Sequence, residues 1–250
     1  PFIGYLIEFF GWSQSLIYLC FIASIMLFFS FALNFSAKSE SSKAGTNQTL
    51  KEALKEAFQS KSFNLLTLGF FVCGFQVTFI AIHLPAFIKD VSLPFWVGGW
   101  ALALIGLFNV VGTIYFGYLG DRLSKKNLLA LLYSLRGILF LVFIFLPKTE
   151  LSVLIFACVL GILWLSTVPL TSGIITVVFG PYYMSMLYGI AFMSHQVGSF
   201  LGAWIGGKLF DYYGSYDAMW WICVALGFVA AVMHIPIIER PVSRLVNQEL

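Results

Sequence analysis

Four charges crowd into one short segment near the middle of this chain, Gly117-Tyr118-Leu119-Gly120-Asp121-Arg122-Leu123-Ser124-Lys125-Lys126. Long apolar runs, residues 95–119 and 128–146, border this segment on both sides. Charged side chains are costly inside a bilayer, so a charged cluster marks a point where the chain reaches water. We therefore interpret residues 117–126, called the charged hinge below, as a turn between two membrane-spanning helices.

The composition is that of a membrane protein. Hydrophobic residues make up 60% of the chain and charged residues 10%, with a mean hydropathy of +0.93, whereas a soluble domain carries about 25% charged residues. The 27 phenylalanines are too many for a soluble fold of this length, so lipid must solvate many of them. A net charge of +3 does not indicate nucleic-acid binding. No metal site is expected, because the four cysteines lie within apolar runs and lack metal-ligand spacing: Cys20, Cys73, Cys158 and Cys223.

The apolar runs are long enough to cross a bilayer as helices, which takes about 20 residues each. None of them alternates between apolar and polar residues as the strands of a membrane β-barrel do. The sequence therefore predicts an all-α polytopic membrane protein. Residues 1–10 are too short to span, and seven full-length spans follow, at residues 15–33, 65–87, 95–119, 128–146, 151–170, 186–209 and 219–238.

Lys and Arg residues predict the orientation, because they concentrate on the cytoplasmic side. With residues 34–64 placed inside, the inner side holds ten of these cations and the outer side holds Lys89, Lys148 and Lys208. The C-terminus is therefore expected to be cytoplasmic, in a multi-pass protein of the cell or inner membrane. The long polar segment splits into a linker-like part, residues 36–49, and an amphipathic part, residues 49–63, which predicts a short helix at the membrane surface. A plain spacer and a regulatory or partner-binding helix both fit it.

Two segments share one pattern of leucine, apolar, acid, aromatic, aromatic and glycine. The first begins at Leu6 and ends at Gly11, and the second begins 203 residues later, at Leu209, and ends at Gly214. Both are expected on the outer side between two spans, as in a parallel structural repeat. If the repeat holds, a second charged hinge lies about 86 residues before Pro1, and the whole protein contains another bundle.

The charged hinge resembles the G-x-x-x-D-R-x-[GS]-[KR]-[KR] signature of the major facilitator superfamily, which occurs between helices two and three and between helices eight and nine. Phe10-Gly11-Trp12 resembles the link from helix five to helix six, and the glycine-rich run before Asp211 resembles helix eleven. The resemblance implies a major facilitator fold. Residues 1–33 would then be the end of the N-terminal bundle (the tail of helix five, and helix six), residues 34–63 the cytoplasmic linker, and residues 64–250 the C-terminal six-helix bundle, helices seven to twelve, with a short tail.

The same resemblance gives the charged hinge a function as a conformational latch between the two bundles. Physical chemistry adds that a carboxylate such as that of Asp121 can cap the N-terminus of an adjacent helix. A plain cytoplasmic loop remains the alternative interpretation. The residues predicted to form the latch are Gly117, Asp121, Arg122, Lys125 and Lys126. Three glycines at every fourth position predict a helix face packed closely against a neighbour, either static or sliding: Gly198, Gly202 and Gly206.

Polar side chains within the spans are candidates for a substrate cavity, since sites of this architecture lie near mid-membrane. The candidates are Gln76, Asn109, Thr113, His195, Gln196 and Trp164, with Ser166 and Thr167 as weaker ones. Each could instead tie helices together, and a neutral His195 could bond another helix. Arg136 is the one cation deep in a predicted span, which makes it a functional hypothesis. The resemblance places its helix at the periphery, where snorkelling or pairing with a neighbour is the alternative.

Residues 107–113 resemble the eighth helix of oxalate/formate antiporters and monocarboxylate porters. That branch carries Arg at the place of Thr113 and, in antiporters, Lys near the place of His195, so this chain lacks both cations. A carboxylate substrate stays open through protonated His195. Other features of the substrate are not readable from the sequence.

The leading hypothesis is a secondary active transporter that moves a small solute by alternating access, coupled to protons or to a counter-substrate. Its expected partners are that solute, the lipid bilayer and the missing N-terminal half of the same chain, with no nucleic acid and no cofactor. No phosphate-binding G-x-x-x-x-G-K-[ST] loop occurs, which disfavours ATP-driven pumping. An intramembrane enzyme is disfavoured because the three histidines are scattered, without carboxylates at ligand spacing. A membrane sensor or partner-binding protein that kept the fold is the remaining alternative.

Overall fold

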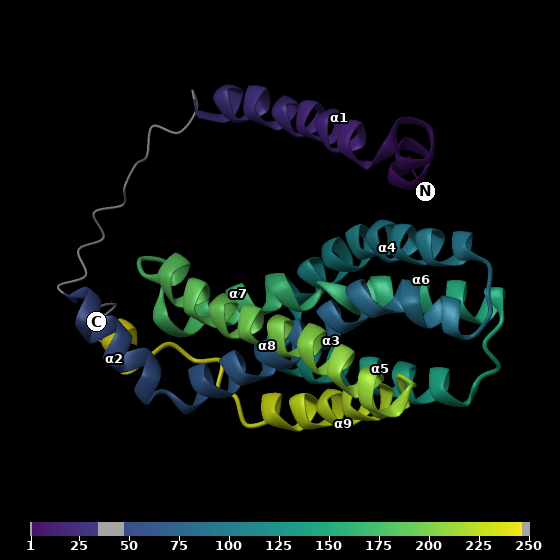
Figure 1. Ribbon diagram of the computed structural model, residues 1–250. Helices are drawn as coiled ribbons and strands as arrows, with labels where there is room; N and C mark the ends of the chain where they lie inside the picture. The colour runs from purple at the N-terminus through teal and green to yellow at the C-terminus, as the bar shows by residue number, and fades with distance from the viewer. Residues whose placement is uncertain (1, 35–47, 247–250) are drawn as a thin grey trace. The chain divides into compact units, whose positions relative to one another are not determined.

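The computed structural model describes residues 2–34 and 48–246, and these residues form helices joined by short turns, without a strand among them (Figure 1). This confirms the predicted all-α fold. The linker-like residues 36–47 lie outside the described residues. The helices are α1 Phe2–Asn34, α2 Leu50–Gln59, α3 Lys61–Asp90, α4 Phe95–Arg122, α5 Lys125–Phe145, α6 Glu150–Trp164, α7 Thr167–Phe179, α8 Met184–Tyr213, α9 Asp217–His234 and α10 Ser243–Val246.

The chain forms two compact units, residues 1–47 and 48–250. The first holds α1, whose helical backbone is interrupted at Gly11, with φ 75° and ψ 164°. This conformation lies in the region that residues with a Cβ avoid, so a glycine is required there. The Ser15 hydroxyl donates to the Gly11 carbonyl at 2.7 Å, which satisfies a group that the interruption frees. The predicted turn at Phe10-Gly11-Trp12 is therefore present.

Six helical segments are long and apolar enough to cross a membrane: Ile3–Met26, Lys61–Asp90, Phe95–Arg122, Lys125–Phe145, Glu150–Phe179 and Asp217–His234. Five of them correspond to predicted spans, and Ile3–Met26 overlaps the predicted span 15–33 only in part, because it also includes residues that were expected to be too short to cross. The seventh predicted span falls in α8, which has 30 residues but is not among the six. Its glycines, serines, His195 and Gln196 lower its hydropathy, so its length fits a crossing better than its composition does.

The second unit is built from three closely packed helix pairs, α3 with α8, α4 with α6, and α5 with α9. Each pair meets at glycines, where an added Cβ would collide with atoms of the partner helix. Van der Waals packing of this kind drives helix association in lipid, where the hydrophobic effect does not. The glycines that meet a partner backbone are Gly74, Gly198 and Gly202 between α3 and α8, Gly112 and Gly161 between α4 and α6, and Gly227 between α5 and α9.

The short helix predicted at residues 49–63 is present as α2, which ends at Gln59, and α3 begins at Lys61. Thr49 and Glu52 form a capping box that satisfies free N–H groups at its start. The backbone N–H and the hydroxyl of Thr49 both donate to the Glu52 carboxylate. These two hydrogen bonds hold the pKa of Glu52 below its ordinary value, because they stabilise the charged form. The apolar face of α2 buries Ala53 and Ala57, so this helix docks on the bundle beside the start of α3.

Candidate functional site

The polar residues of the bundle gather around an interruption in one membrane-crossing segment, between α6 and α7 at Leu165 and Ser166. Pro169 explains it, because proline has no N–H and its ring clashes with the carbonyl four residues earlier, that of Leu165. The Leu165 carbonyl accepts instead from the Val168 N–H at 2.9 Å. The interruption lies near the middle of the Glu150–Phe179 segment, which is long and apolar enough to cross a membrane.

Asn109 of α4 contacts this interruption from one side. Its Oδ1 accepts from the Leu165 N–H at 3.1 Å and from the Thr113 hydroxyl at 3.3 Å. The Ser166 hydroxyl donates back to the Ile162 carbonyl. Asn109 therefore behaves as a cap supplied by a neighbouring helix, and Thr113 supports it.

Arg136 of α5 contacts the interruption from another helix. Its Nη2 donates to the carbonyls of Leu163 and Trp164, at 2.6 and 2.9 Å, which are at the end of α6. Its Nη1 donates to Gln76 Oε1 at 3.3 Å and to Cys73 Sγ at 3.5 Å. The family resemblance placed this residue on a peripheral, partly lipid-facing helix, but its side chain is 1% exposed and faces the bundle interior.

No carboxylate is among the hydrogen-bond partners of the Arg136 guanidinium in the described residues. The salt bridge found within residues 2–34 and 48–246 joins Arg244 to Glu56 and does not involve Arg136. The Cys73 thiol also lies 3.4 Å from the Thr167 hydroxyl, and Gln76 donates to the Cys223 carbonyl at 2.8 Å. The network therefore links α3, α5, α9 and the start of α7 around one buried cation.

His195 and Gln196 form a second polar group, on α8. His195 Nδ1 lies 3.2 Å from Gln196 Oε1, and its ring packs against Phe70 and Phe192, with centroids 4.8 and 5.4 Å away. Its Nε2 is buried and has no hydrogen-bond partner in the described part of the chain. Gln196 is exposed on the surface of the bundle.

The structure brings four of the predicted cavity residues together with Arg136 at the interruption: Gln76, Asn109, Thr113 and Trp164. Trp164 takes part through its backbone carbonyl. Sequence reasoning missed Cys73, which reads as a small apolar residue, and Pro169. The proline was visible inside the predicted span 151–170 and could have indicated the interruption.

The charged hinge is held by a residue that sequence reasoning missed, Glu239, just beyond α9. Its carboxylate accepts from the Ser124 hydroxyl at 3.0 Å, from the Lys125 N–H at 3.2 Å and also from the Lys126 N–H. It therefore caps the N-terminus of α5, the position where Asp121 was expected to act. Asp121 is exposed and has no hydrogen bond or ion pair within the described residues. The signal was a carboxylate directly after the last apolar run.

The remaining predicted latch residues lie at the surface or against α7. The Arg122 guanidinium lies over the Tyr118 ring, 4.4 Å from its centroid. The Lys126 ammonium donates to the Ile235 carbonyl at 3.0 Å, which ties the hinge to the end of α9. Gly117 lies beside Pro169, close to the interruption.

The three spaced glycines of α8 face α3. An added Cβ would collide with the Phe71 carbonyl at Gly198, with the Phe75 carbonyl at Gly202 and with the His83 ring at Gly206. The His83 Nε2–H donates to the Ala203 carbonyl, 2.9 Å away. The face is therefore in close contact along three turns of α8.

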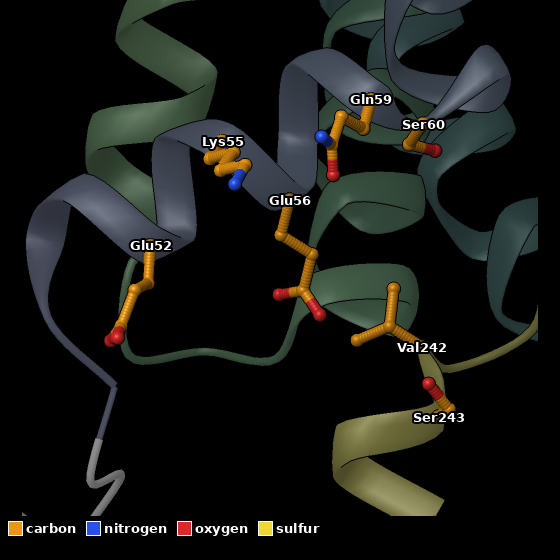
Figure 2. Close-up of a pocket in the computed structure, with 7 residues that line it drawn as sticks. All are labelled: Glu52, Lys55, Glu56, Gln59, Ser60, Val242 and Ser243. Carbon is orange, nitrogen blue, oxygen red and sulfur yellow. The ribbon is translucent and has the colours of Figure 1, made fainter.

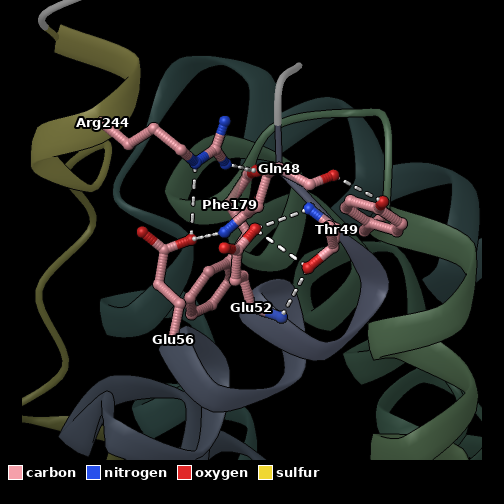
Figure 3. Close-up of polar contacts among 7 residues, drawn as sticks. Gln48, Thr49, Glu52, Glu56, Phe179 and Arg244 are labelled. Carbon is pink, nitrogen blue, oxygen red and sulfur yellow. Dashed lines mark hydrogen bonds and ion pairs between the residues drawn. The ribbon is translucent and has the colours of Figure 1, made fainter.

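At the same end as the charged hinge, α2 meets the segment that follows α9 (Figure 3). Glu56 accepts from Gln48 at 2.9 Å and pairs with Arg244 at 3.5 Å, and Arg244 donates to the Phe179 carbonyl at 3.2 Å. Beside these contacts lies an open groove of about 540 Å³ (Figure 2), lined by Glu52, Lys55, Glu56, Gln59, Ser60, Val242 and Ser243. Its two glutamates and one lysine give it no strong preference for an anion.

Glycine-packed helices, an interrupted crossing segment and a charged hinge together define a polytopic membrane protein. The chain belongs to the Major Facilitator Superfamily, whose family model matches residues 1–203. It is 28% identical over 189 residues to the uncharacterized MFS-type transporter YcxA of Bacillus subtilis. The matched region covers 73% of this chain and 46% of YcxA. It is also 28% identical over 192 residues to human monocarboxylate transporter 12, covering 70% of this chain and 37% of that protein. The chain thus spans less than half the length of these relatives.

Proposed function

We propose that the protein of which this chain is part is a secondary active transporter that moves a small solute across the membrane by alternating access. The observation that carries the proposal is the buried polar network around the α6–α7 interruption, inside a bundle of the Major Facilitator Superfamily. Polar side chains and an interrupted helix near mid-membrane are typical of transporter sites. An enzyme is disfavoured, because the chain belongs to a family of transporters.

The substrate we propose is a small carboxylate. Arg136 places a positive charge within the bundle, and no carboxylate is among its hydrogen-bond partners in the described residues. A buried positive charge makes the electrostatic potential around it more positive, which favours an anion nearby. His195 adds a second site of positive charge when protonated. The printed name of human monocarboxylate transporter 12 points to the same class of substrate.

We assign the parts of the chain accordingly. Residues 1–33 end the N-terminal bundle, residues 34–63 form the cytoplasmic linker, and residues 64–250 form the C-terminal bundle and its tail. The C-terminus is cytoplasmic, which agrees with the cations of the charged hinge. Gln196, exposed on α8, contacts the solute, and protons or a counter-substrate drive its movement.

Uptake by reconstituted protein tests this proposal. The native protein, with any sequence that flanks this chain, is placed in liposomes and supplied with radiolabelled lactate, pyruvate and acetate, with glucose as a neutral control. We expect saturable uptake of at least one carboxylate, accelerated by the same compound inside the vesicle. Saturable uptake of glucose alone would contradict the carboxylate proposal. Binding of a carboxylate without uptake would instead favour the second candidate, a sensor that kept the fold.

A further inference from the structure

The interruption between α6 and α7 frees backbone groups that a continuous helix would pair. Lipid offers no water to satisfy such groups, and each one left without a partner costs several kcal/mol. Here the partners are side chains of other helices. Asn109 of α4 accepts from the Leu165 N–H, and Arg136 of α5 donates to the Leu163 and Trp164 carbonyls.

The two residues are complementary in chemistry. Asn109 supplies an acceptor for the freed N–H, and Arg136 supplies a planar fork of donors for two adjacent carbonyls. Both reach the same three-residue segment, residues 163–165, from different helices. Hydrogen bonds from α4 and α5 therefore hold this segment on two sides, while Pro169 prevents it from becoming a regular helix.

Packing alone does not account for Arg136. Its side chain is 1% exposed, and an apolar residue of similar length would fill the same volume without the cost of a buried charge. Its two shortest hydrogen bonds, 2.6 and 2.9 Å, go to the freed carbonyls, and the contacts with Gln76 and Cys73 are longer. The contact distances thus point to the interruption as the main function of this side chain.

We propose that Arg136 and Asn109 are positioning residues for transport, which hold the interrupted α6–α7 segment in one conformation. The transport part of this inference rests on the proposed function. The conformational part does not, since it concerns the backbone of residues 163–165. An interrupted helix with a proline is a natural place for a bend, and these two side chains determine how far it bends.

A distance across the interruption tests the proposal without a substrate. Spin labels at Val159→Cys in α6 and Val177→Cys in α7 suit this purpose, because these side chains are 39% and 37% exposed. A continuous helix would separate the two positions by about 27 Å along its axis. Cys20 and Cys158 are replaced by serine, and Cys73 and Cys223 stay because they are buried. The native protein, with any flanking sequence, is measured in liposomes by double electron–electron resonance.

We expect one narrow distance population in the parent protein. Asn109→Leu and Arg136→Gln should each broaden it or add a second population, and Arg136→Lys should give an intermediate result, because a lysine cannot bridge both carbonyls as a fork. Leu163→Ala is the matched control, since it leaves a void at the same place but keeps the backbone carbonyl; it should preserve the parent distances. Pro169→Ala should shift the distance towards that of a continuous helix.

The parent distribution in both Asn109→Leu and Arg136→Gln would overturn the proposal, as would broadening by Leu163→Ala of equal size. Asn109→Leu decides alone if Arg136→Gln cannot be purified in a folded form. In uptake, the Asn109→Leu variant should lose maximal rate by roughly tenfold with a smaller change in half-saturation. Absence of uptake in the parent protein would refute the proposed function and leave the distance result standing.

Discussion

At the scale of single residues, Glu239 shows how one carboxylate can fix a turn. It lies at the end of the last membrane-spanning helix and accepts from one hydroxyl and two backbone N–H groups at the start of α5. A negative charge at a helix N-terminus interacts favourably with the helix dipole, and hydrogen bonds to a charged group are stronger than neutral ones. The charged hinge is thus tied to α9 through its backbone.

Glu239→Gln should therefore lower the stability of the bundle. The amide keeps the shape of the side chain but loses the charge, so we expect a loss of about 1–2 kcal/mol in the free energy of unfolding. Thermal unfolding of the purified protein in detergent measures it. Asp121→Asn is the control, because Asp121 is exposed and has no partner in the described residues; its unfolding should change by less than about 0.5 kcal/mol.

Uptake measurements on the same two variants test the latch, which the stability measurement does not. If Asp121 acts in the latch, Asp121→Asn lowers uptake without lowering stability. Normal uptake by Asp121→Asn would remove Asp121 from the latch, and an unchanged melting temperature in Glu239→Gln would show that the cap contributes little.

At the scale of helices, the pairing of α3 with α8 depends on close backbone contact. A Cβ at Gly202 would collide with the Phe75 carbonyl, whereas at Gly189, on the same helix, nothing lies within 4 Å. Neither glycine has an unusual backbone conformation, because the positive φ values of glycine occur at Gly11, Gly180 and Gly214. The difference between the two positions is therefore one of packing alone.

Gly202→Ala should destabilise the bundle by about 1–3 kcal/mol, because α3 and α8 must move apart. Gly189→Ala should be neutral or stabilising by up to about 1 kcal/mol, since alanine favours a helix more than glycine does. Melting temperatures of the two variants in the same detergent give the comparison. Equal losses in both would mean that helix packing is not what distinguishes these positions.

At the scale of the second unit, residues 238–244, called the strap below, connect the ends of several helices. The Ile238 N–H donates to the Ser62 hydroxyl and the Val242 N–H to the Val178 carbonyl, each at 3.0 Å. Arg244 completes the strap by its contacts with Glu56 and the Phe179 carbonyl. The strap brings α2, α3, α5 and α7 together at one end of the unit.

Arg244→Ala should loosen this strap without unfolding the bundle. The Arg244–Glu56 pair is partly exposed, with relative exposures of 22% and 25%, and such pairs contribute up to about 1 kcal/mol. We expect faster proteolysis after α9 and within α2, with little change in melting temperature. Lys55→Ala serves as the control, because Lys55 lines the same groove without an ion pair in the described residues. Equal proteolysis of the two variants would contradict the strap.

The sequence was sufficient for the properties that depend on local sums of residues. Length and apolarity of each run decide whether it crosses a bilayer, and the distribution of Lys and Arg predicts the side on which its ends lie. The charged hinge and the turn at Gly11 were likewise visible, because each needs particular residues next to one another. Five of the seven predicted spans, part of a sixth and the helix of residues 50–59 followed from these local patterns.

The tertiary structure alone decided the partners of the polar residues. Arg136 meets carbonyls 27 and 28 residues away, Asn109 meets an N–H 56 residues away, and Glu239 meets a hydroxyl 115 residues away. No local pattern encodes such pairs, because a mid-membrane polar side chain can turn to lipid, to a cavity or to another helix. Glycine contacts set the rotation of each helix about its axis, and that rotation brought Arg136 to the interruption near Pro169 instead of to the lipid.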